Sequence, residues 1–384
     1  MKIAIETVFW GGLLLIVHSY LIYPLSLMLL SAVNKRYVLK DRSAEPKREI
    51  SILISAYNEE RMIGKRIAEL LAIDYSPFEI IVGIDGATDR TYEILKQFND
   101  TRLRVFPFDE NRGKVWVLND ICKQARGEIL IFSDANTQLH KDSLKKLERH
   151  FSDPRVGGVC GRLELDPTEG ARASALESEY WGIESRIKRL EGDMGMTLGA
   201  NGAIYAIRRE LFVPFATGSR IADDFILPLR IIEKGYYFVY ESEALAYEQS
   251  GDVRIEFNRK VRIGAAIVAT LKASGALLNP LRGFVAYAFW SHKVLRWLVP
   301  YLLIVIILAN VPLMQNSPFF LVTAVLQGVF YIGAVIGILG LLLGIQIPIL
   351  SYLGYFVAAN AALIVGLGKS FLKEQDTKWK VARD

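Results

Sequence analysis

The chain contains Ile129-Leu130-Ile131-Phe132-Ser133-Asp134, an apolar run that ends in a carboxylate. The run Ile80-Ile81-Val82-Gly83-Ile84 ends in Asp85 in the same way. Short apolar runs of this kind are typical of buried parallel strands, and ligands bind beyond the carboxyl ends of such strands. The sequence therefore predicts an α/β domain whose polar ligands gather at one edge of a sheet.

Asn136 follows Asp134 at a spacing that puts two oxygen ligands on the same side of an extended segment. Such oxygens suit a hard cation that bridges a diphosphate. A third carboxylate comes from Asp223 and Asp224, which open a helical-looking stretch. Together these groups suggest the transfer of a group from a nucleotide diphosphate, with a carboxylate as the base.

The middle of the chain alternates between strand-like and helix-like segments. The predicted strands are Glu49–Ala56, Glu79–Ile84, Leu103–Phe106, Glu128–Ser133, Gly157–Leu165, Tyr236–Tyr240 and Ala244–Glu248, and Gly199–Ile207 is predicted to be a glycine-hinged loop that runs into a further strand. The predicted helices are Glu60–Ile73, Asp89–Phe98, Val115–Ala125, Ser143–Phe151, Ala171–Leu190 and Asp223–Lys234. This alternation indicates a mostly parallel sheet in a domain that spans 49–252.

The 384 residues are 52% hydrophobic, and the excess over a soluble protein lies at the two ends. Thr7–Val33 exceeds the roughly 20 residues of a membrane span. A cleaved signal peptide is the alternative, but its apolar region has about 7–15 residues. Three more apolar runs follow: Val294–Met314, Pro318–Leu343 and Ile347–Leu367. We therefore predict transmembrane helices at 1–33 and, about three of them, at 283–370, with a buried helical core as the alternative for the latter.

Basic residues crowd the predicted linker 34–48, directly after the first span. By the positive-inside tendency, the domain lies in the cytoplasm and the chain is a multi-pass cell-membrane protein. The side of the tail 371–384 stays open, because three C-terminal spans put it outside while its basic residues favour the inside. Cys122 and Cys160 are too few for a disulfide framework and are predicted to be buried.

The region 253–282 mixes basic and apolar residues. Its basic members up to position 277 are Arg254, Arg259, Lys260, Arg262 and Lys272. This composition predicts a helix in the membrane interface, with basic groups that face lipid phosphate or the active site. A core helix with one solvated face is the alternative.

An ordered series of motifs resembles the membrane-integrated family 2 glycosyltransferases, which include cellulose synthase, hyaluronan synthase and poly-N-acetylglucosamine synthase. The motifs are Ser55–Glu60, Asp85–Asp89, Asn111–Lys114, Asp134–Asn136, Ala222–Asp224 and Arg259–Ile263. The resemblance runs from Ser51 through the C-terminal spans. It implies a GT-A-like fold, with a Rossmann-like, mostly parallel sheet, in the cytoplasmic domain.

The resemblance also implies how a nucleotide sugar is bound. Tyr57 and Glu59 would contact uracil, and Asp85 would contact the uridine. Lys114 and Arg262 would contact the diphosphate. These contacts imply a nucleotide-sugar donor, with UDP as the nucleotide.

The remaining site residues follow from the same resemblance. Asp134, with Asn136, would bind Mg²⁺ or Mn²⁺, and Asp134 would also contact the nucleotide. The loop that begins at Gly199 would line the sugar pocket. Asp224 would be the catalytic base, ionised because it lies at a helix N-terminus, whereas Asp223 would only cap the helix. The other partners implied are a saccharide or lipid-linked acceptor and membrane lipids, with no nucleic acid.

Two positions depart from the family pattern. Asn136 stands where a second aspartate is usual, which weakens the expected metal affinity. Arg259 and Ile263 stand where processive members carry Gln and Trp. Their absence leaves open a transferase that adds a single sugar directly to a membrane lipid. A non-catalytic scaffold that binds nucleotide sugars is a further alternative, and a transporter is disfavoured because the spans carry almost no ionisable residues.

Overall fold

The structure is a computed structural model that describes residues 1–39, 47–166, 173–216, 222–249 and 253–372. The described residues divide into two compact units. The first contains residues 1–29, 173–180 and 253–372. The second contains residues 30–39, 47–166, 181–216 and 222–249. Residues 40–46 of the predicted linker and 373–384 of the predicted tail lie outside the described residues.

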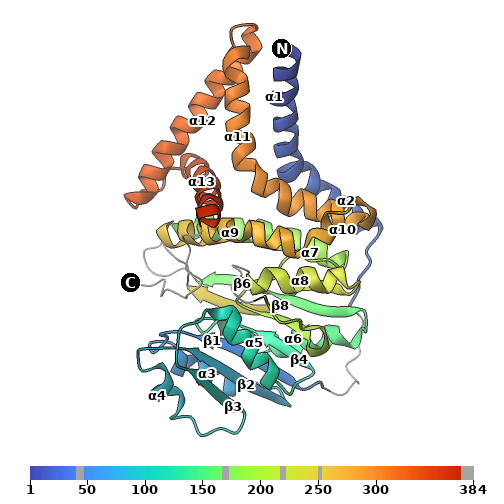
Figure 1. Ribbon diagram of the computed structural model, residues 1–384, viewed down its shortest axis with the longest axis vertical. Helices are drawn as coiled ribbons and strands as arrows, with labels where there is room; N and C mark the ends of the chain where they lie inside the picture. The colour runs from blue at the N-terminus through green and yellow to red at the C-terminus, as the bar shows by residue number, and fades with distance from the viewer. Residues whose placement is uncertain (40–46, 167–172, 217–221, 250–252, 373–384) are drawn as a thin grey trace. The chain divides into compact units, whose positions relative to one another are not determined.

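An eight-stranded sheet in the order β3-β2-β1-β4-β7-β6-β8-β5 forms the core of the second unit (Figure 1). The strands are β1 (Ile50–Ala56), β2 (Phe78–Asp85), β3 (Leu103–Phe108), β4 (Ile129–Phe132), β5 (Gln138–Leu139), β6 (Val156–Asp166), β7 (Tyr205–Arg208) and β8 (Tyr237–Gln249). Strands β3, β2, β1 and β4 are parallel, as are β6 and β8, whereas β7 is antiparallel to both its neighbours. The predicted α/β fold with a mostly parallel sheet is confirmed.

Strand β1 lies in the middle of the parallel half of the sheet. Its Ala56 pairs with Ile84 of β2, and its Leu53 pairs with Phe132 of β4. The chain passes from β3 on one side of β1 to β4 on the other, which makes a topological switch point between β1 and β4. Strands β1, β2 and β4 are buried throughout, as expected of strands covered on both faces.

Helices cover this sheet. They are α3 (Ile63–Leu71), α4 (Thr91–Leu95), α5 (Lys114–Gln124), α6 (Ser143–Glu148), the second half of α7 (Ala173–Asp193) and α8 (Asp223–Glu233). Helix α5 packs closely on β2 at Gly83, where a Cβ atom would clash with Val117 and lie 2.9 Å from Ile121. This close packing fixes the first residue of α5, Lys114, near the carboxyl ends of the strands.

The first unit is helical. Its elements include α1 (Lys2–Val17), α2 (Tyr23–Val33), α9 (Val253–Ala273), α10 (Phe284–Ala288), α11 (Leu295–Leu313), α12 (Pro318–Leu342) and α13 (Leu350–Leu372). Four helical stretches are long and apolar enough to cross a membrane: Lys2–Val33, Phe284–Leu313, Pro318–Leu342 and Leu350–Phe371. The predicted apolar helices at 1–33 and in 283–370 are therefore present, and they indicate a membrane protein.

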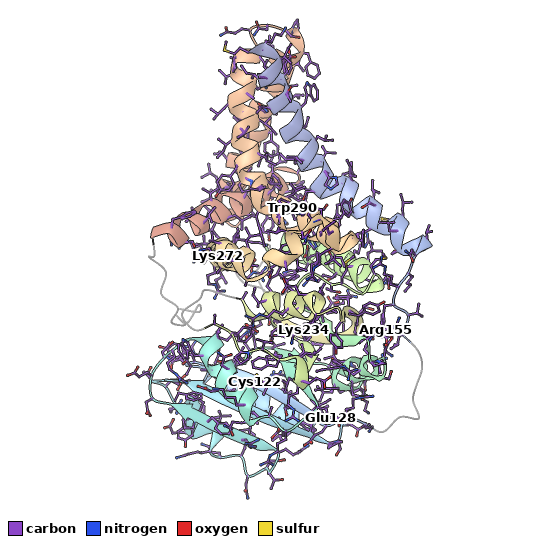
Figure 2. The ribbon with its side chains drawn as sticks, turned by 45° about the vertical axis from the view of Figure 1, so that its right-hand side comes forward. Cys122, Glu128, Arg155, Lys234, Lys272 and Trp290 are labelled. Atoms are coloured by element: carbon purple, nitrogen blue, oxygen red, sulfur yellow. The ribbon has the colours of Figure 1, made fainter. Side chains whose placement is uncertain are left out.

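The structure differs from the predicted elements in two places. The predicted strands Tyr236–Tyr240 and Ala244–Glu248 form one strand, β8, which pairs along β6 across register shifts. Strand β5 was not predicted, because its two residues are too few to show a periodic pattern. Cys122, labelled in Figure 2, and Cys160 are buried, as predicted.

Candidate active site

Several predicted site residues lie at the carboxyl ends of the parallel strands. Tyr57 follows β1, Asp85 ends β2, and Asp134 follows β4 after one intervening residue. Because Ala56 pairs with Ile84, Tyr57 and Asp85 occupy neighbouring positions at this edge. Tyr57 and Glu59 are half-buried, and their contacts with uracil stay predictions.

Asp85 is fully buried and braces the loop that precedes α5. Its Oδ1 accepts a hydrogen bond from the Arg112 N–H at 2.8 Å, and its Oδ2 accepts one from the Gly113 N–H at 2.8 Å. Burial raises the pKa of Asp85, although these backbone donors and the Arg112 charge oppose the rise. Asp85 thus fixes the backbone just before Lys114, and its contact with uridine stays a prediction.

The ammonium of Lys114 lies between two carboxylates. Its Nζ is 2.8 Å from Asp134 Oδ1 and 3.1 Å from Asp223 Oδ1. Burial by itself would lower the pKa of Lys114, but the charges of Asp134, Asp223 and Asp224 raise it overall. Lys114 is therefore a fixed positive charge at the strand edge, where a phosphate group can pair with it.

Asp223 has a larger part in the site than the helix cap predicted for it. Its side chain is buried, and its Oδ2 accepts a hydrogen bond from the Tyr205 hydroxyl at 2.7 Å. The Tyr205 ring stacks on Phe132 of β4, with centroids 4.7 Å apart. Asp223 therefore ties α8 and β7 to Lys114, a link between distant segments that no spacing in the sequence signals.

Asp224, the predicted base, is the second residue of α8. Burial raises its pKa to about 6, the charges of Asp223 and Asp134 add to the rise, and Lys114 and Lys188 oppose it. The predicted lowering of this pKa by the helix N-terminus is wrong, because burial and two carboxylates outweigh the helix dipole. A carboxylate with a pKa near the working pH is well suited to accept a proton.

Gly202 marks the space that Asp134 and Asp224 share. A Cβ atom on Gly202 would lie 3.0 Å from Asp134 Oδ2 and 3.6 Å from Asp224 Oδ2. Gly199 has a φ of 113°, and its missing side chain faces the Phe225 ring. Gly202, in the same predicted loop, is thus the glycine that opens the space between the carboxylates, and the sugar contact of Gly199 stays a prediction.

The donor set at Asp134 fits a hard divalent cation. Asp134 Oδ2 faces the space beside Gly202, and the half-buried Asn136 lies in the turn that follows Asp134. Among the residues that the structure describes, no three His, Cys, Asp or Glu side chains are grouped as a metal site. Oxygens of a bound diphosphate are suitable further ligands for a cation at Asp134, since Mg²⁺ is commonly bound by one or two carboxylates plus substrate phosphates.

Arg262 lies in the other unit. It is exposed on α9, the helix that the sequence predicts in the region 253–282. Its contact with the diphosphate, and the location of α9 in a membrane interface, stay predictions.

Residues 51–212 match the family described as Glycosyl transferase family 2. Poly-beta-1,6-N-acetyl-D-glucosamine synthase from Staphylococcus aureus (strain COL) is 26% identical over 220 residues, which are 56% of this chain and 53% of that protein. The synthase of the same name from Staphylococcus epidermidis is 26% identical over 202 residues, 52% of this chain and 49% of that protein. The chain thus spans about half the length of the curated relatives it matches.

One solved structure is similar along nearly the whole chain. It is the mannosyltransferase PcManGT from Pyrobaculum calidifontis in complex with GDP-Man and Mn²⁺. The TM-score is 0.70 at 20% identity, and the match covers 97% of this chain and 99% of that one. This similarity confirms the predicted GT-A-like fold, and the match of residues 51–212 agrees with the predicted resemblance to the family 2 glycosyltransferases.

An alanine at position 202 should block the site. The methyl group would enter the space between Asp134 and Asp224, and a displacement of about 1 Å at reacting groups can cost about 10²-fold in rate. We expect Gly202→Ala to lower kcat by this order, with an unfolding temperature close to that of the wild type. Gly182→Ala is the matched control, because no atom lies within 4 Å of its added Cβ. Equal activity of Gly202→Ala and wild type would contradict this assignment.

The rate should fall in acid with the protonation of Asp224. Because this carboxylate must be ionised to accept a proton, kcat/KM should fall about tenfold for each pH unit below about 6. The charged groups that set this pKa are Asp223, Asp134, Lys114 and Lys188. Asp74→Asn is the control, because its side chain is 95% exposed, and it should show the same fall of kcat/KM in acid as the wild type. A kcat/KM that stays constant from about pH 7 to about pH 5 would exclude this base.

Proposed function

We propose that this chain, whose residues 51–212 belong to glycosyl transferase family 2, is a membrane-bound inverting transferase that uses a nucleoside-diphosphate sugar. It transfers the sugar to a saccharide or lipid-linked acceptor in polysaccharide or glycoconjugate synthesis. The observation that carries this proposal is the convergence of Lys114, Asp134 and Asp224 around the space beside Gly202. A cationic side chain and a bound metal ion both stabilise the charge that develops on a departing diphosphate, and a base accepts the proton of the attacking hydroxyl.

The donor in this proposal is a UDP-sugar. Tyr57 offers an aromatic face for stacking on uracil, and Glu59 can accept a hydrogen bond from a base N–H. Both side chains are half-buried beside the end of β1. GDP-mannose is the competing donor, since the mannosyltransferase of similar structure binds GDP-Man.

Asp134 and Asn136 would hold Mg²⁺ or Mn²⁺ together with the donor. When bound, the ion supplies positive charge that stabilises the departing diphosphate. The Mn²⁺ in the similar mannosyltransferase supports this part of the proposal. Lys114 adds a fixed positive charge 2.8 Å from Oδ1 of the same carboxylate, Asp134.

Asp224 accepts the proton of the acceptor hydroxyl. The acceptor oxygen forms its bond to the anomeric carbon while the bond from that carbon to the diphosphate oxygen breaks, and the diphosphate leaves with the electron pair. Attack from the face opposite the diphosphate turns an α-linked donor into a β-linked product. Burial favours this step, because it keeps the Asp224 pKa high enough for proton transfer.

In this proposal the chain is a multi-pass protein of the cell membrane with its catalytic domain in the cytoplasm, and the four long apolar helical stretches support the membrane location. Lipid-linked acceptors are available there, and membrane lipids surround the helices. A second candidate function is the transfer of one sugar directly to a membrane lipid. It is favoured because Arg259 and Ile263 stand where processive family members carry Gln and Trp. A product that partitions into organic solvent would favour this second candidate.

A donor panel tests the proposal. We expect detergent-purified protein to release UDP from one UDP-sugar when Mg²⁺ or Mn²⁺ is present, and EDTA to abolish the release. GDP-mannose and a lipid extract that contains acceptors are tested in parallel. Release of GDP alone would overturn the UDP assignment and keep the transferase. Binding of a donor without release of either nucleotide, even with the extract, would favour the non-catalytic scaffold.

Asp224→Asn tests the base. Because general-base catalysis is typically worth about 10²–10⁴ in rate, this variant should lose that factor in kcat and still bind the donor with Mn²⁺. Nucleoside-diphosphate release measures the rate, and titration calorimetry with the donor measures binding. Near-normal turnover of the Asn variant would remove Asp224 from the mechanism.

A further inference from the structure

The loop from Gly199 to Ala203 carries Gly202 into the space between Asp134 and Asp224. The position of this loop therefore sets how much room the two carboxylates leave for reacting groups. Two buried cationic side chains hold the loop, one near its start and one at its end. They are Lys188 and Arg66, and the sequence motifs point to neither.

Lys188 lies on α7, and 4% of its surface is exposed. Its Nζ donates a hydrogen bond to the Ala200 carbonyl at 3.0 Å and another to the Asn201 side-chain oxygen. The Asn201 amide in turn donates to the Gly161 carbonyl at 2.9 Å, at a register shift in β6. An ammonium has three donors and no acceptor, so Lys188 can fasten several loop oxygens at once.

This end of the loop is also joined to the helix that carries the base. The Ala200 N–H donates to the backbone carbonyl of Asp224 at 2.7 Å. The same residue thus binds Lys188 through its carbonyl and Asp224 through its N–H. A shift of Ala200 would move both Gly202 and the start of α8.

Arg66 acts at the other end of the loop, through Ser133. Arg66 lies on α3 with 3% of its surface exposed, and its Nη2 donates to the Ser133 hydroxyl at 2.8 Å. That hydroxyl donates to the Ala203 carbonyl at 2.7 Å. Because Ser133 directly precedes Asp134, this relay ties the loop to the strand that carries the metal-binding carboxylate.

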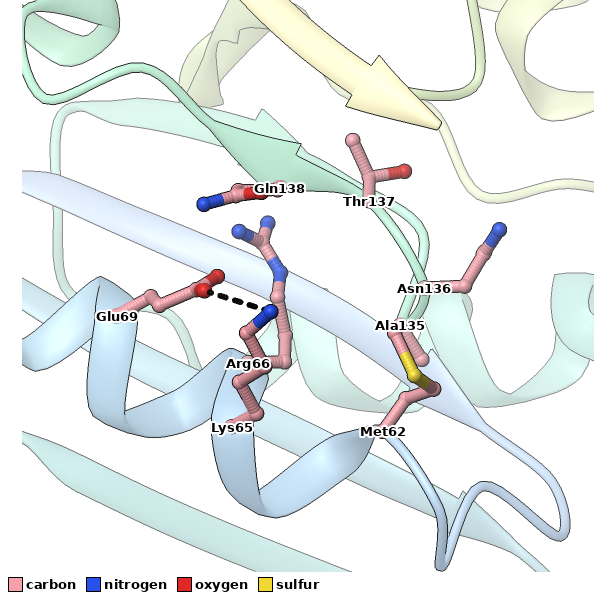
Figure 3. Close-up of a pocket in the computed structure, with 8 residues that line it drawn as sticks. All are labelled: Met62, Lys65, Arg66, Glu69, Ala135, Asn136, Thr137 and Gln138. Carbon is pink, nitrogen blue, oxygen red and sulfur yellow. Dashed lines mark ion pairs between the residues drawn. The ribbon is translucent and has the colours of Figure 1, made fainter. Parts of the chain in front are cut away.

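Arg66 also lines a small cavity between α3 and residues 135–138, which follow Asp134 in the chain. Its Nε and Nη1 have no hydrogen-bond partner among the described residues. The cavity has a volume of about 30 Å³ and is lined in part by Asn136 and Gln138, toward which the guanidinium rises from α3 (Figure 3). A cavity of this size has room for one ordered water beside Arg66.

We propose that Lys188 and Arg66 are positioning residues for sugar transfer. They hold the 199–203 loop in the position where Gly202 leaves room between Asp134 and Asp224 for the reacting groups. The inference rests on the proposed function, because it assigns a role in that reaction to the clamp, which consists of Lys188, Arg66 and Ser133. Neither residue needs to touch the substrate. Without the Lys188 ammonium or the Ser133 hydroxyl, the carbonyl of Ala200 or Ala203 would lose its side-chain hydrogen-bond donor and would shift toward a new partner.

Lys188→Met removes the arm of the clamp that binds the Ala200 carbonyl, and Ser133→Ala removes the arm that binds the Ala203 carbonyl. We expect kcat to fall about 10- to 100-fold in each, with the donor KM changed less than about threefold, because the nucleotide end of the site is left intact. Lys188→Arg keeps a cationic donor and should recover most of the rate. The controls are Lys234→Met, at an exposed residue labelled in Figure 2, and Lys65→Met, next to Arg66 and 70% exposed in its side chain.

Hydrogen exchange separates the clamp from the reaction. Amides of residues 200–204 should exchange faster in Lys188→Met and Ser133→Ala than in wild type, and at wild-type rates in Lys188→Arg and both controls. Unchanged exchange in both arm variants would overturn the inference, as would a loss in Lys188→Arg equal to that in Lys188→Met. If the wild type releases no nucleotide, the proposed function fails, and the exchange rates still decide whether Lys188 and Arg66 hold the loop.

Discussion

The ammonium of Lys114, held between Asp134 and Asp223, is the interaction on which the rest of the site depends. Three segments distant in the chain must come together to form it. Close packing of α5 on Gly83 fixes Lys114, together with the two hydrogen bonds that the Arg112 and Gly113 N–H groups donate to Asp85. Loss of the ammonium would leave the Asp223 carboxylate, whose side chain is only 6% exposed, without its cation, which is destabilising.

One ammonium among three carboxylates leaves an excess of negative charge. This excess, together with burial, raises the pKa of Asp224 to about 6. It also favours the arrival of a divalent cation, which would offset the charge when a diphosphate brings further negative charge. The same charge distribution thus accounts for both the proposed base and the proposed metal requirement.

The sequence predicts the parts of this site that depend on local patterns. Apolar runs that end in Asp85 and Asp134 are enough to place both residues at the carboxyl ends of parallel strands, because register and strand direction bring such ends to one edge. Asp224 follows from its motif. The helical spans follow from length and composition alone.

The remaining features depend on contacts that no local pattern encodes. Tyr205 meets Asp223 only after β7 has paired with β4, and Lys188 meets Ala200 only after α7 has packed beside the loop. The Asp224 pKa was predicted in the wrong direction because the helix dipole is a local effect, whereas burial and the charge of Asp134 arise from tertiary structure. The motif indicates Gly199 and does not single out Gly202, because only the fold shows which glycine faces the carboxylates.

The position of Mn²⁺ in a crystal structure of the protein with a nucleoside diphosphate, located by anomalous scattering, tests the proposed site directly. We expect the ion within coordination distance of Asp134, with diphosphate oxygens completing its ligands and Lys114 turned to the phosphate. A diphosphate and Mn²⁺ bound away from Asp134, with Lys114 still paired to both carboxylates, would contradict the proposed site.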